Sequence, residues 1–502
     1  MSRISILFFL MIAWSIQTVS GQVDQAAIQS FDEYVEANRQ KYQVPGCALV
    51  VVKDGAVVLQ KAYGKRSVTS EAPVTTKTLF GIMSTTKATT AVAMGLLVDE
   101  GKVKWDDKVL DYLPDFQLYD PYVTRELRIK DLFTHNAGLG NADFLWVNDP
   151  NMDQDEILAQ MRHAQPAYSF RGGYTYQNIM YLAAGKVIEK ISGMSWERFM
   201  KERIYTPLKM ENTFPSLAYS AQYDNVSTAH QRLDGEIITI PEMPADAIGP
   251  AGSTWSTIED MTKWVQFLLN KGKVNYQNLI RESTLNEILK PQIIIPTRQF
   301  YPTWRLTNPH FTTYGLGWFQ QDYRGEFLAF HTGSLDGRTA IVGLIPDQDF
   351  GFYFFGNLDH AELRHALLLK AIDVFVKEDN TRDWGEEIDQ MYSNFREVGE
   401  EQVQKRMAQR VEGTTASKDL SAFIGDYRHP FYGLVKIRLQ EEKLHFSQGP
   451  GMEGSLEHFH YNTFQINWSK EWWTADLLQF NLNPRDGEVD QLVQGGVVYE
   501  KE

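Results

Sequence analysis

Ser84 and Lys87 stand three residues apart in the stretch GIMSTTKATT, where an apolar helix is predicted to begin. On a helix this spacing places the hydroxyl and the amine on one face. A hydroxyl beside an amine can act as a nucleophile with its own base. Burial would lower the pKa of the lysine, and a helix N-terminus favours a developing negative charge. The alternative is a capping serine beside a lysine that extends into water.

Tyr176 and Asn178 supply a second pair of groups that could manage protons. The triplet Tyr-x-Asn occurs four times in the chain, so the triplet alone carries little information. Only the copy at Tyr176 lies in GGYTYQNIMYLAAGKVIE, where a glycine-rich loop leads into an apolar helix. The other copies lie in polar sequence and are interpreted as surface residues.

A third candidate element is the run His331, Thr332, Gly333 and Ser334 on a predicted strand late in the chain. A histidine on a strand is more often structural than catalytic. Gly333, however, would allow another backbone to approach closely. At that point the backbone N–H of Ser334 could serve as an oxyanion donor.

The sequence predicts strands at both ends of a domain and helices between them, and these elements must position the candidate residues. The pattern predicts helices, strands and a capping box that opens a further helix. The predicted helices are 26–43, 84–100, 131–139, 176–192, 195–205 and 360–377, the predicted strands are two within 47–64 and 314–322, 327–331, 339–346 and 350–357, and the capping box is Ser256 to Asp260. This order indicates an α/β fold of the α+β type, an antiparallel sheet flanked by helices.

The chain divides into four predicted parts. Residues 1–21 have a positive start, an apolar stretch and small residues before Gln22, which is typical of a signal peptide. Residues 22–378 form the main domain. Residues 379–415 are charged and helix-prone and are interpreted as a connector, and residues 416–502 contain short strands and turns and predict a small β domain.

Bulk composition narrows the possible functions. The 502 residues carry a net charge of −15, which argues against a nucleic-acid-binding surface. The signal peptide predicts a secreted or periplasmic protein without stable membrane insertion after cleavage. Cys47 is the only cysteine, so no intramolecular disulfide is possible. Glycosylation at the sequons of Asn225 and Asn467 would depend on a eukaryotic secretory route.

Taken in order, Ser84-Thr-Thr-Lys87, Tyr176-Gln-Asn178 and His331-Thr-Gly333 resemble the motifs of the penicillin-recognising serine hydrolases. The chain is most similar to the class C β-lactamase-like branch, which includes DD-peptidases, D-amino-acid-releasing peptidases and esterases. The resemblance covers roughly residues 26–377 and implies an all-helical subdomain beside the sheet. It includes the accessory stretches VPGCALVVVKDG, DEGKVKWDDKVLDYLPDF, IKDLFTHNAGL, PAGSTWSTIEDMTKW and YGLGW. The C-terminal segment looks like the small β domain often appended to such hydrolases.

The resemblance implies a role for each site residue. Ser84 would attack a carbonyl and be acylated, and Lys87 and Tyr176 would share the general-base and general-acid duty. Asn178 would orient Lys87 and the substrate amide. The backbone N–H groups of Ser84 and Ser334 would form the oxyanion hole, with Thr332 and Gly333 contributing to substrate binding. No cofactor or metal is expected, and His360 and His365 are interpreted as helix-surface residues.

His331 departs from the pattern, because dedicated β-lactamases of this branch usually carry lysine there. Histidine is charged only below about pH 6.5 unless its surroundings shift its pKa. We therefore expect activity that depends on the titration of His331 near neutral pH. Family members with histidine at this position are often peptidases or esterases. The histidine therefore makes a β-lactamase activity less favoured, without excluding it.

Three functions remain open from the sequence. The first is an exported serine hydrolase acting on a small ester or peptide, which could contain D-amino acids. The second is a true β-lactamase. The third is a penicillin-recognising receptor that acylates once without turnover. The loops around 140–170 and 285–312 are expected to determine the substrate, and the oligomeric state is not assigned.

Overall fold

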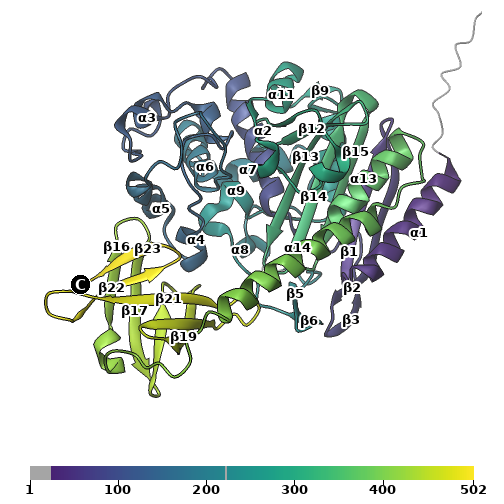
Figure 1. The fold of residues 1–502 in the computed structure, drawn as a ribbon. Coiled ribbons are helices and arrows are strands. Elements are labelled where there is room, and N and C mark those ends of the chain that lie inside the picture. Colours follow the sequence, from purple (N-terminus) through teal and green to yellow (C-terminus); the bar gives the residue numbers. More distant parts are fainter. Residues whose placement is uncertain (1–23, 221–222) are drawn as a thin grey trace, which may run out of the picture.

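The computed structural model describes residues 24–220 and 223–502, so the predicted signal peptide lies outside the described residues. Within those two ranges no helix is long and apolar enough to cross a membrane. The chain forms a large domain of sheet and helices with a smaller β domain beside it (Figure 1).

A nine-stranded antiparallel sheet forms the centre of the large domain. In spatial order its strands are β10 (Ile293–Ile294), β11 (Thr312–Tyr314), β12 (Phe319–Tyr323), β13 (Glu326–Leu335), β14 (Arg338–Ile345), β15 (Phe350–Gly356), β1 (Gly46–Lys53), β2 (Ala56–Ser67) and β3 (Ser70–Pro73). The N-terminal strand β1 pairs with β15, with Cys47 opposite Gly356. Both ends of the domain therefore build one sheet, which confirms the predicted fold class.

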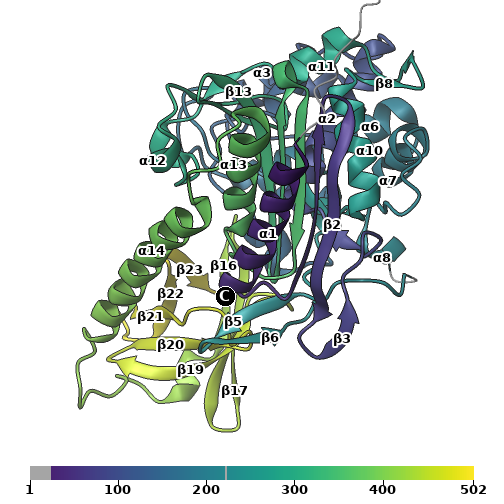
Figure 2. The same ribbon diagram turned by 90° about the vertical axis from the view of Figure 1, so that its right-hand side faces the viewer.

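The strand β1 is apolar on both sides because it separates two cores. Cys47, Leu49 and Val51 pack into the core beneath α1 (Gln25–Lys41) and α13 (Leu363–Val376). The intervening Ala48, Val50 and Val52 face the other core, which contains α10 (Ile258–Leu269). Successive side chains of a strand point to opposite faces, so a continuous apolar run predicts burial on both. The pair α1 and α13 covers one face of the sheet (Figure 2).

A helical subdomain lies on the α10 side of the sheet and is centred on α2 (Thr86–Asp99), which packs against α6 (Ile179–Ser192) and α9 (Gly249–Gly252). Nearly every residue of α2 is buried, as expected for a helix that is apolar on all sides. The other short helices of the large domain are α3 (Pro121–Glu126), α4 (Phe144–Asn148), α5 (Gln154–Gln160), α7 (Trp196–Met200), α8 (Leu217–Ser220), α11 (Glu282–Leu289) and α12 (Trp304–Thr307).

Several predicted helix boundaries were wrong, including the start of the helix predicted over 360–377, which begins at Leu363. The helix expected over 131–139 is a single 3₁₀ turn, Ile129–Leu132, and the chain leaves it through His135, which has a φ of 59°. The helix expected from residue 176 begins at Ile179, because the Gln177 side chain accepts a hydrogen bond from the Ile179 N–H. The cap of α10 is Thr257 rather than Ser256, since the Thr257 hydroxyl accepts from the Asp260 N–H.

The helix α14 (Trp384–Met407) runs from the large domain to a closed β-barrel of eight strands. The barrel strands are β16 (Gly425–His429), β17 (Gly433–Gln440), β18 (Lys443–Ser447), β19 (Glu453–His460), β20 (Thr463–Trp468), β21 (Asp476–Leu482), β22 (Val489–Gln494) and β23 (Val497–Lys501). In β17, Val435 and Ile437 point into the barrel core while Lys436 and Arg438 are exposed. The barrel closes through pairing of β16 with β23.

The barrel contacts the large domain at α4. Phe144 packs against Phe431 and Tyr432 of the barrel, with ring centroids 5.1 and 4.7 Å apart. The Gly451 N–H donates to the Asn148 carbonyl oxygen at 2.7 Å. A β-carbon added at Gly451 would lie 2.1 Å from the carbonyl oxygen of Val147, so only glycine allows this approach.

A second contact joins the barrel to the turn between β13 and β14. The indole N–H groups of Trp472 and Trp473 both donate to Asp336 Oδ2, at 3.2 and 3.4 Å. Asp336 directly follows Leu335, the last residue of β13. The barrel is therefore anchored to both α4 and the end of β13.

Gly451→Ala tests whether the α4 contact holds the barrel. The added methyl group collides with the Val147 carbonyl, so we expect a lower midpoint of thermal unfolding in calorimetry. Gly399→Ala is the matched control, because Gly399 lies within α14 with no atom within 4 Å of the added carbon. That variant should keep or slightly raise the midpoint. Equal midpoints for wild type and both variants would contradict the contact.

Candidate active site

Ser84 lies in a single 3₁₀ turn, Met83–Thr85, which leads directly into α2. The preceding residue Met83 has a φ of 47°, a left-handed conformation that costs a non-glycine residue of order 1–3 kcal/mol. Ser84 is half-buried and lines a cavity, whereas its neighbours Thr85 and Thr86 are fully buried. The turn therefore presents one hydroxyl to the cavity.

Lys87 is fully buried, and its amine reaches back to Ser84. Its Nζ donates to Ser84 Oγ at 3.1 Å, to Asn178 Oδ1 at 2.6 Å and to the Ala251 carbonyl oxygen at 2.9 Å. The predicted pairing of Ser84 with Lys87 thus exists as a direct contact. The alternative of a lysine extending into water does not fit a side chain with no exposed surface.

Burial is the main influence on the Lys87 amine and lowers its pKa to about 7, while the carboxylate of Asp143 opposes this shift. Within the described part of the chain, no carboxylate hydrogen-bonds to the amine directly. A large fraction of Lys87 is therefore neutral near pH 7 and able to accept a proton.

Tyr176 approaches the pair from the segment before α6. Its ring lies beneath the Lys87 amine, with Nζ 4.8 Å from the ring centroid, and its hydroxyl shares a hydrogen bond with Ser84. Burial raises the pKa of Tyr176 well above its ordinary value, and the hydrogen bond with Ser84 only partly offsets this. Tyr176 is consequently a phenol at neutral pH and a hydrogen-bond donor.

Asn178 connects Lys87 to an acidic residue that sequence reasoning missed. The Asn178 side chain accepts from Lys87 and donates through Nδ2 to Asp143 Oδ1 at 2.9 Å. Trp146 Nε1 donates to the same carboxylate oxygen at 3.1 Å. Asp143 lies just before α4, so the α4 segment forms one wall of the site.

The end of β13 forms the opposite wall. The strand β12 pairs with β13 only as far as Phe330, so residues 331–335 have β14 on one side and a free edge on the other. Thr332 and Ser334 line the cavity from this edge. Gly333 faces the turn that carries Ser84, because a β-carbon there would lie 2.5 Å from the Ile82 carbonyl oxygen and 3.2 Å from the Ser84 nitrogen. Its predicted role in close approach fits this contact.

His331 does not titrate near neutral pH, which corrects the expectation from the sequence. The side chain is fully buried, and this burial, together with the Lys87 charge, lowers its pKa to about 3. Its Nδ1 lies 2.7 Å from the Thr332 carbonyl oxygen and must carry the proton, so Nε2 accepts from the Tyr314 hydroxyl at 2.9 Å. His331 is thus neutral, with both ring nitrogens hydrogen-bonded.

An ion cluster secures β13 from the other face of the sheet. Arg364 donates to the Gly333 carbonyl oxygen and to Ser334 Oγ, both at 2.7 Å. Burial alone would raise the pKa of Glu362, but Arg364 and His365 together hold it well below its ordinary value. His365 is buried against Glu362, with Nδ1 2.7 Å from the carboxylate, so its predicted place on the helix surface was wrong.

The cavity at Ser84 has a volume of about 240 Å³. Both predicted specificity loops contribute: Asp143 and Trp146 come from 140–170 and Tyr301 from 285–312. Its lining residues are Met83, Ser84, Asp143, Trp146, Tyr176, Asn178, Ala245, Ile248, Gly252, Tyr301, Thr332, Ser334 and Leu335. Tyr301 also bonds through its hydroxyl to the Thr332 hydroxyl. The sequence offered no local signal for Asp143, Trp146 or Arg364.

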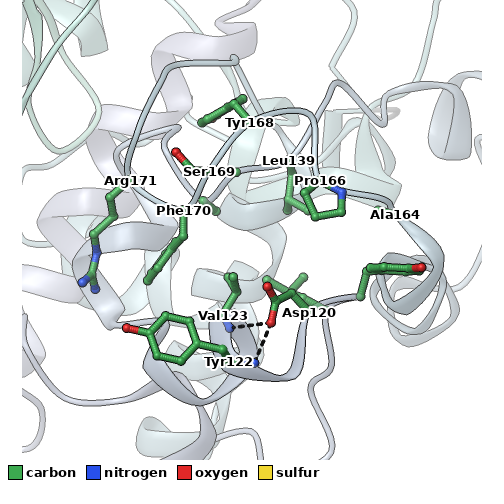
Figure 3. Close-up of a pocket in the computed structure, with 14 residues that line it drawn as sticks. Asp120, Tyr122, Val123, Leu139, Ala164, Pro166, Tyr168, Ser169, Phe170 and Arg171 are labelled. Atoms are coloured by element: carbon green, nitrogen blue, oxygen red, sulfur yellow. Dashed lines mark hydrogen bonds between the residues drawn. The ribbon is translucent and has the colours of Figure 1, made fainter.

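A second, larger cavity of about 460 Å³ lies in the helical subdomain and shares no lining residue with the first. Figure 3 shows Phe170, Tyr122 and Leu139 around it, with the Asp120 carboxylate accepting from the N–H groups of Tyr122 and Val123. Over residues 24–220 and 223–502, no group of three or more His, Cys, Asp or Glu side chains is placed to hold a metal ion.

Comparisons with known proteins match both parts of the chain. Residues 31–375 match the family model described as Beta-lactamase, and residues 409–494 match one described as Domain of unknown function (DUF3471). A curated relative, Unguisins hydrolase ungD' of Aspergillus campestris, is 27% identical over 439 residues. The alignment covers 83% of this chain and 78% of that protein.

Two solved structures share the fold. The octameric penicillin-binding protein homologue from Pyrococcus abyssi has a TM-score of 0.61 and 19% identity, covering 94% of this chain and 100% of that one. A D-stereospecific amidohydrolase from Streptomyces sp. has a TM-score of 0.56 and 22% identity, covering 70% of this chain and 98% of that one.

Replacement of Lys87 by methionine tests the effect of burial on its amine. An unfolded lysine has a pKa of about 10.4, so unfolding takes up a proton and wild-type stability falls as the pH falls from 10 towards 7. The slope is about 1.4 kcal/mol per pH unit. We therefore expect the free energy of unfolding of Lys87→Met, relative to wild type, to rise by about 2–3 kcal/mol between pH 9 and pH 7.

Urea unfolding at several pH values gives this difference, with the exposed Lys436→Met on the barrel surface as the control. For that control, the difference in the free energy of unfolding from wild type should change little with pH. A Lys87→Met difference that stays constant from pH 9 to pH 6 would mean that the buried amine keeps its ordinary pKa.

Proposed function

Because this chain belongs to the Beta-lactamase family, we propose that it is a serine hydrolase in which Ser84 forms an acyl-enzyme with an ester or peptide substrate. One observation carries the proposal: the Ser84 hydroxyl lies 3.1 Å from the amine of a fully buried lysine whose pKa is about 7. A nucleophile with an adjacent base of matched pKa is the requirement for covalent catalysis at neutral pH.

In the proposed acylation step Lys87 is the general base. Its neutral amine takes the proton of Ser84 as Oγ bonds to the substrate carbonyl carbon. Tyr176 is unsuited to this role, because its pKa lies well above the ordinary value. It instead donates a hydrogen bond and passes the proton from Lys87 to the leaving oxygen or nitrogen as the scissile bond breaks. Asn178 keeps the lysine amine directed at Ser84.

The negative charge that develops on the carbonyl oxygen needs donors on the opposite side. We assign this role to the backbone N–H groups of Ser84 and Ser334, which the close packing of Gly333 on the Ser84 backbone brings near each other. Water then attacks the acyl carbon with Lys87 again as base, and the proton returns to Ser84 Oγ. This sequence of steps uses no metal or cofactor.

The free edge of β13 favours an extended substrate. Residues 331–335 lack a strand partner on the cavity side, so a peptide can add there through backbone hydrogen bonds. One of the solved structures with the same fold is named as a D-stereospecific amidohydrolase, and a hydrolase is among the relatives. A peptide-like substrate therefore ranks ahead of a simple ester.

Export belongs to the proposal as well. The apolar stretch at 6–14, preceded by Arg3 and followed by small residues, supports cleavage before Gln22 and release outside the cytoplasm.

Hydrolysis of a short-chain p-nitrophenyl ester by residues 22–502 tests the acyl-enzyme. We expect steady turnover by wild type and a loss of at least about a thousandfold in kcat for Ser84→Ala, since the nucleophile is removed. A single burst without turnover would favour the receptor, and rapid hydrolysis of a cephalosporin would favour the β-lactamase. Equal rates for wild type and Ser84→Ala would refute Ser84 as the nucleophile.

The pH dependence distinguishes Lys87 from His331. The base must be neutral, so kcat/KM for an uncharged ester should rise with pH and reach half of its plateau near pH 7. His331→Gln can lower the plateau but should leave this midpoint in place, because the pKa of His331 is about 3. A midpoint that moves by a full pH unit in His331→Gln would restore the histidine as the titrating group.

A further inference from the structure

Asp143 presents a carboxylate to the catalytic cavity and has no part in the steps proposed above. It is half-exposed at the cavity wall, at the residue before α4. Among the described residues that line this cavity, Asp143 is the only one with a charged side chain. The charge that a bound substrate meets there is therefore negative.

The carboxylate is held in one orientation and still has capacity to accept. Oδ1 accepts from Asn178 Nδ2 and Trp146 Nε1, at 2.9 and 3.1 Å, and Oδ2 accepts from Asn141 Nδ2 at 2.9 Å. These are three donors, whereas a carboxylate has about four acceptor positions. A fixed carboxylate with a free position on a cavity wall is suited to a donor that arrives with the substrate.

Among the described residues, no cation lines the cavity beside this carboxylate. Lys87 is fully buried behind Asn178 and does not line the cavity. Arg364 is bonded to Glu362 and to the Gly333 carbonyl oxygen on the other face of the sheet. His331, at the position where the β-lactamases of the branch carry lysine, is neutral. A substrate carboxylate would meet repulsion from Asp143 without a compensating positive group.

We infer that Asp143 selects substrates that carry an ammonium group close to the reacting carbonyl, such as the free amino terminus of a peptide or an amino-acid amide. The inference rests on the proposed function, since it names the substrate class of the same site. Binding would form a charge-assisted hydrogen bond from the ammonium group to the carboxylate, beside the acylated serine. A substrate that places a carboxylate at this position would be disfavoured by repulsion from Asp143.

Matched p-nitroanilides test the inference in the active enzyme. D-alanine, L-alanine and β-alanine p-nitroanilides carry an ammonium group at two distances from the carbonyl. Lactic and 3-hydroxypropionic acid p-nitroanilides replace it by a hydroxyl of similar size. For at least one pair we expect kcat/KM to favour the ammonium substrate by about tenfold, as for a partly desolvated charge pair. In Asp143→Asn the preference should fall to about one.

The ratio between the two substrates of a pair is the readout because any general loss of activity in Asp143→Asn affects both substrates alike. Asp143→Glu keeps the charge and should retain most of the preference. Asp149→Asn removes an equal charge at the other end of α4, outside the cavity lining, and should leave the ratio unchanged. A wild-type preference for the hydroxyl substrates, or a ratio that survives Asp143→Asn, would overturn the inference.

Binding without turnover separates the inference from the proposed function. In Ser84→Ala, calorimetry should show alaninamide binding about tenfold more tightly than lactamide, and the difference should vanish in the double variant Ser84→Ala/Asp143→Asn. If wild type hydrolyses none of the anilides or esters but this difference is present, the hydrolase proposal fails and the ammonium site stands. If hydrolysis occurs and the two amides bind equally well, the ammonium site is refuted.

Discussion

The burial of the Lys87 amine is the constraint on which the rest of the site depends. An ammonium group without a carboxylate partner is expensive in an apolar interior, and the protein meets this cost with three acceptors and a lowered pKa. Those acceptors come from three separate segments: the turn before α2, the start of α6 and the short helix α9. Three segments of the subdomain thus converge on the Lys87 amine.

The sheet contributes the strand edge of β13 to the site. The β12–β13 pairing stops at Phe330, which leaves an unpaired strand edge of β13 beside Ser84. Gly333 leaves room for this approach, Arg364 bonds the strand from the other face of the sheet, and His331 accepts a hydrogen bond from Tyr314. Ser84, Lys87 and the strand edge therefore meet where the helical subdomain and the sheet pack against each other.

The fold brings together the residues that were predicted from their spacing in the sequence. The residues that were missed belong to no short motif whose spacing could have indicated them. Ser84 with Lys87, and Tyr176 with Asn178, each lie on one short segment, so local sequence predicts their pairing. Asp143 is a single acid in a loop, and only its tertiary contact with Asn178 shows that it belongs to the site. The error at His331 came from assuming a solvated imidazole, since burial cannot be read from one strand. Closure of the barrel depends on pairing between β16 and β23, which local patterns do not specify, and the exact domain boundaries stay predictions.

The seam between the barrel and α4 couples two regions that are remote in sequence. Val147 and Asn148 meet Gly449 and Gly451 backbone to backbone, on the same five-residue helix that carries Trp146 into the cavity. A short helix has little internal rigidity of its own. Sequence drift in the barrel can therefore reach the cavity at Ser84 through α4 without altering any residue that lines this cavity, and exchange of barrels between related chains would change what supports Trp146.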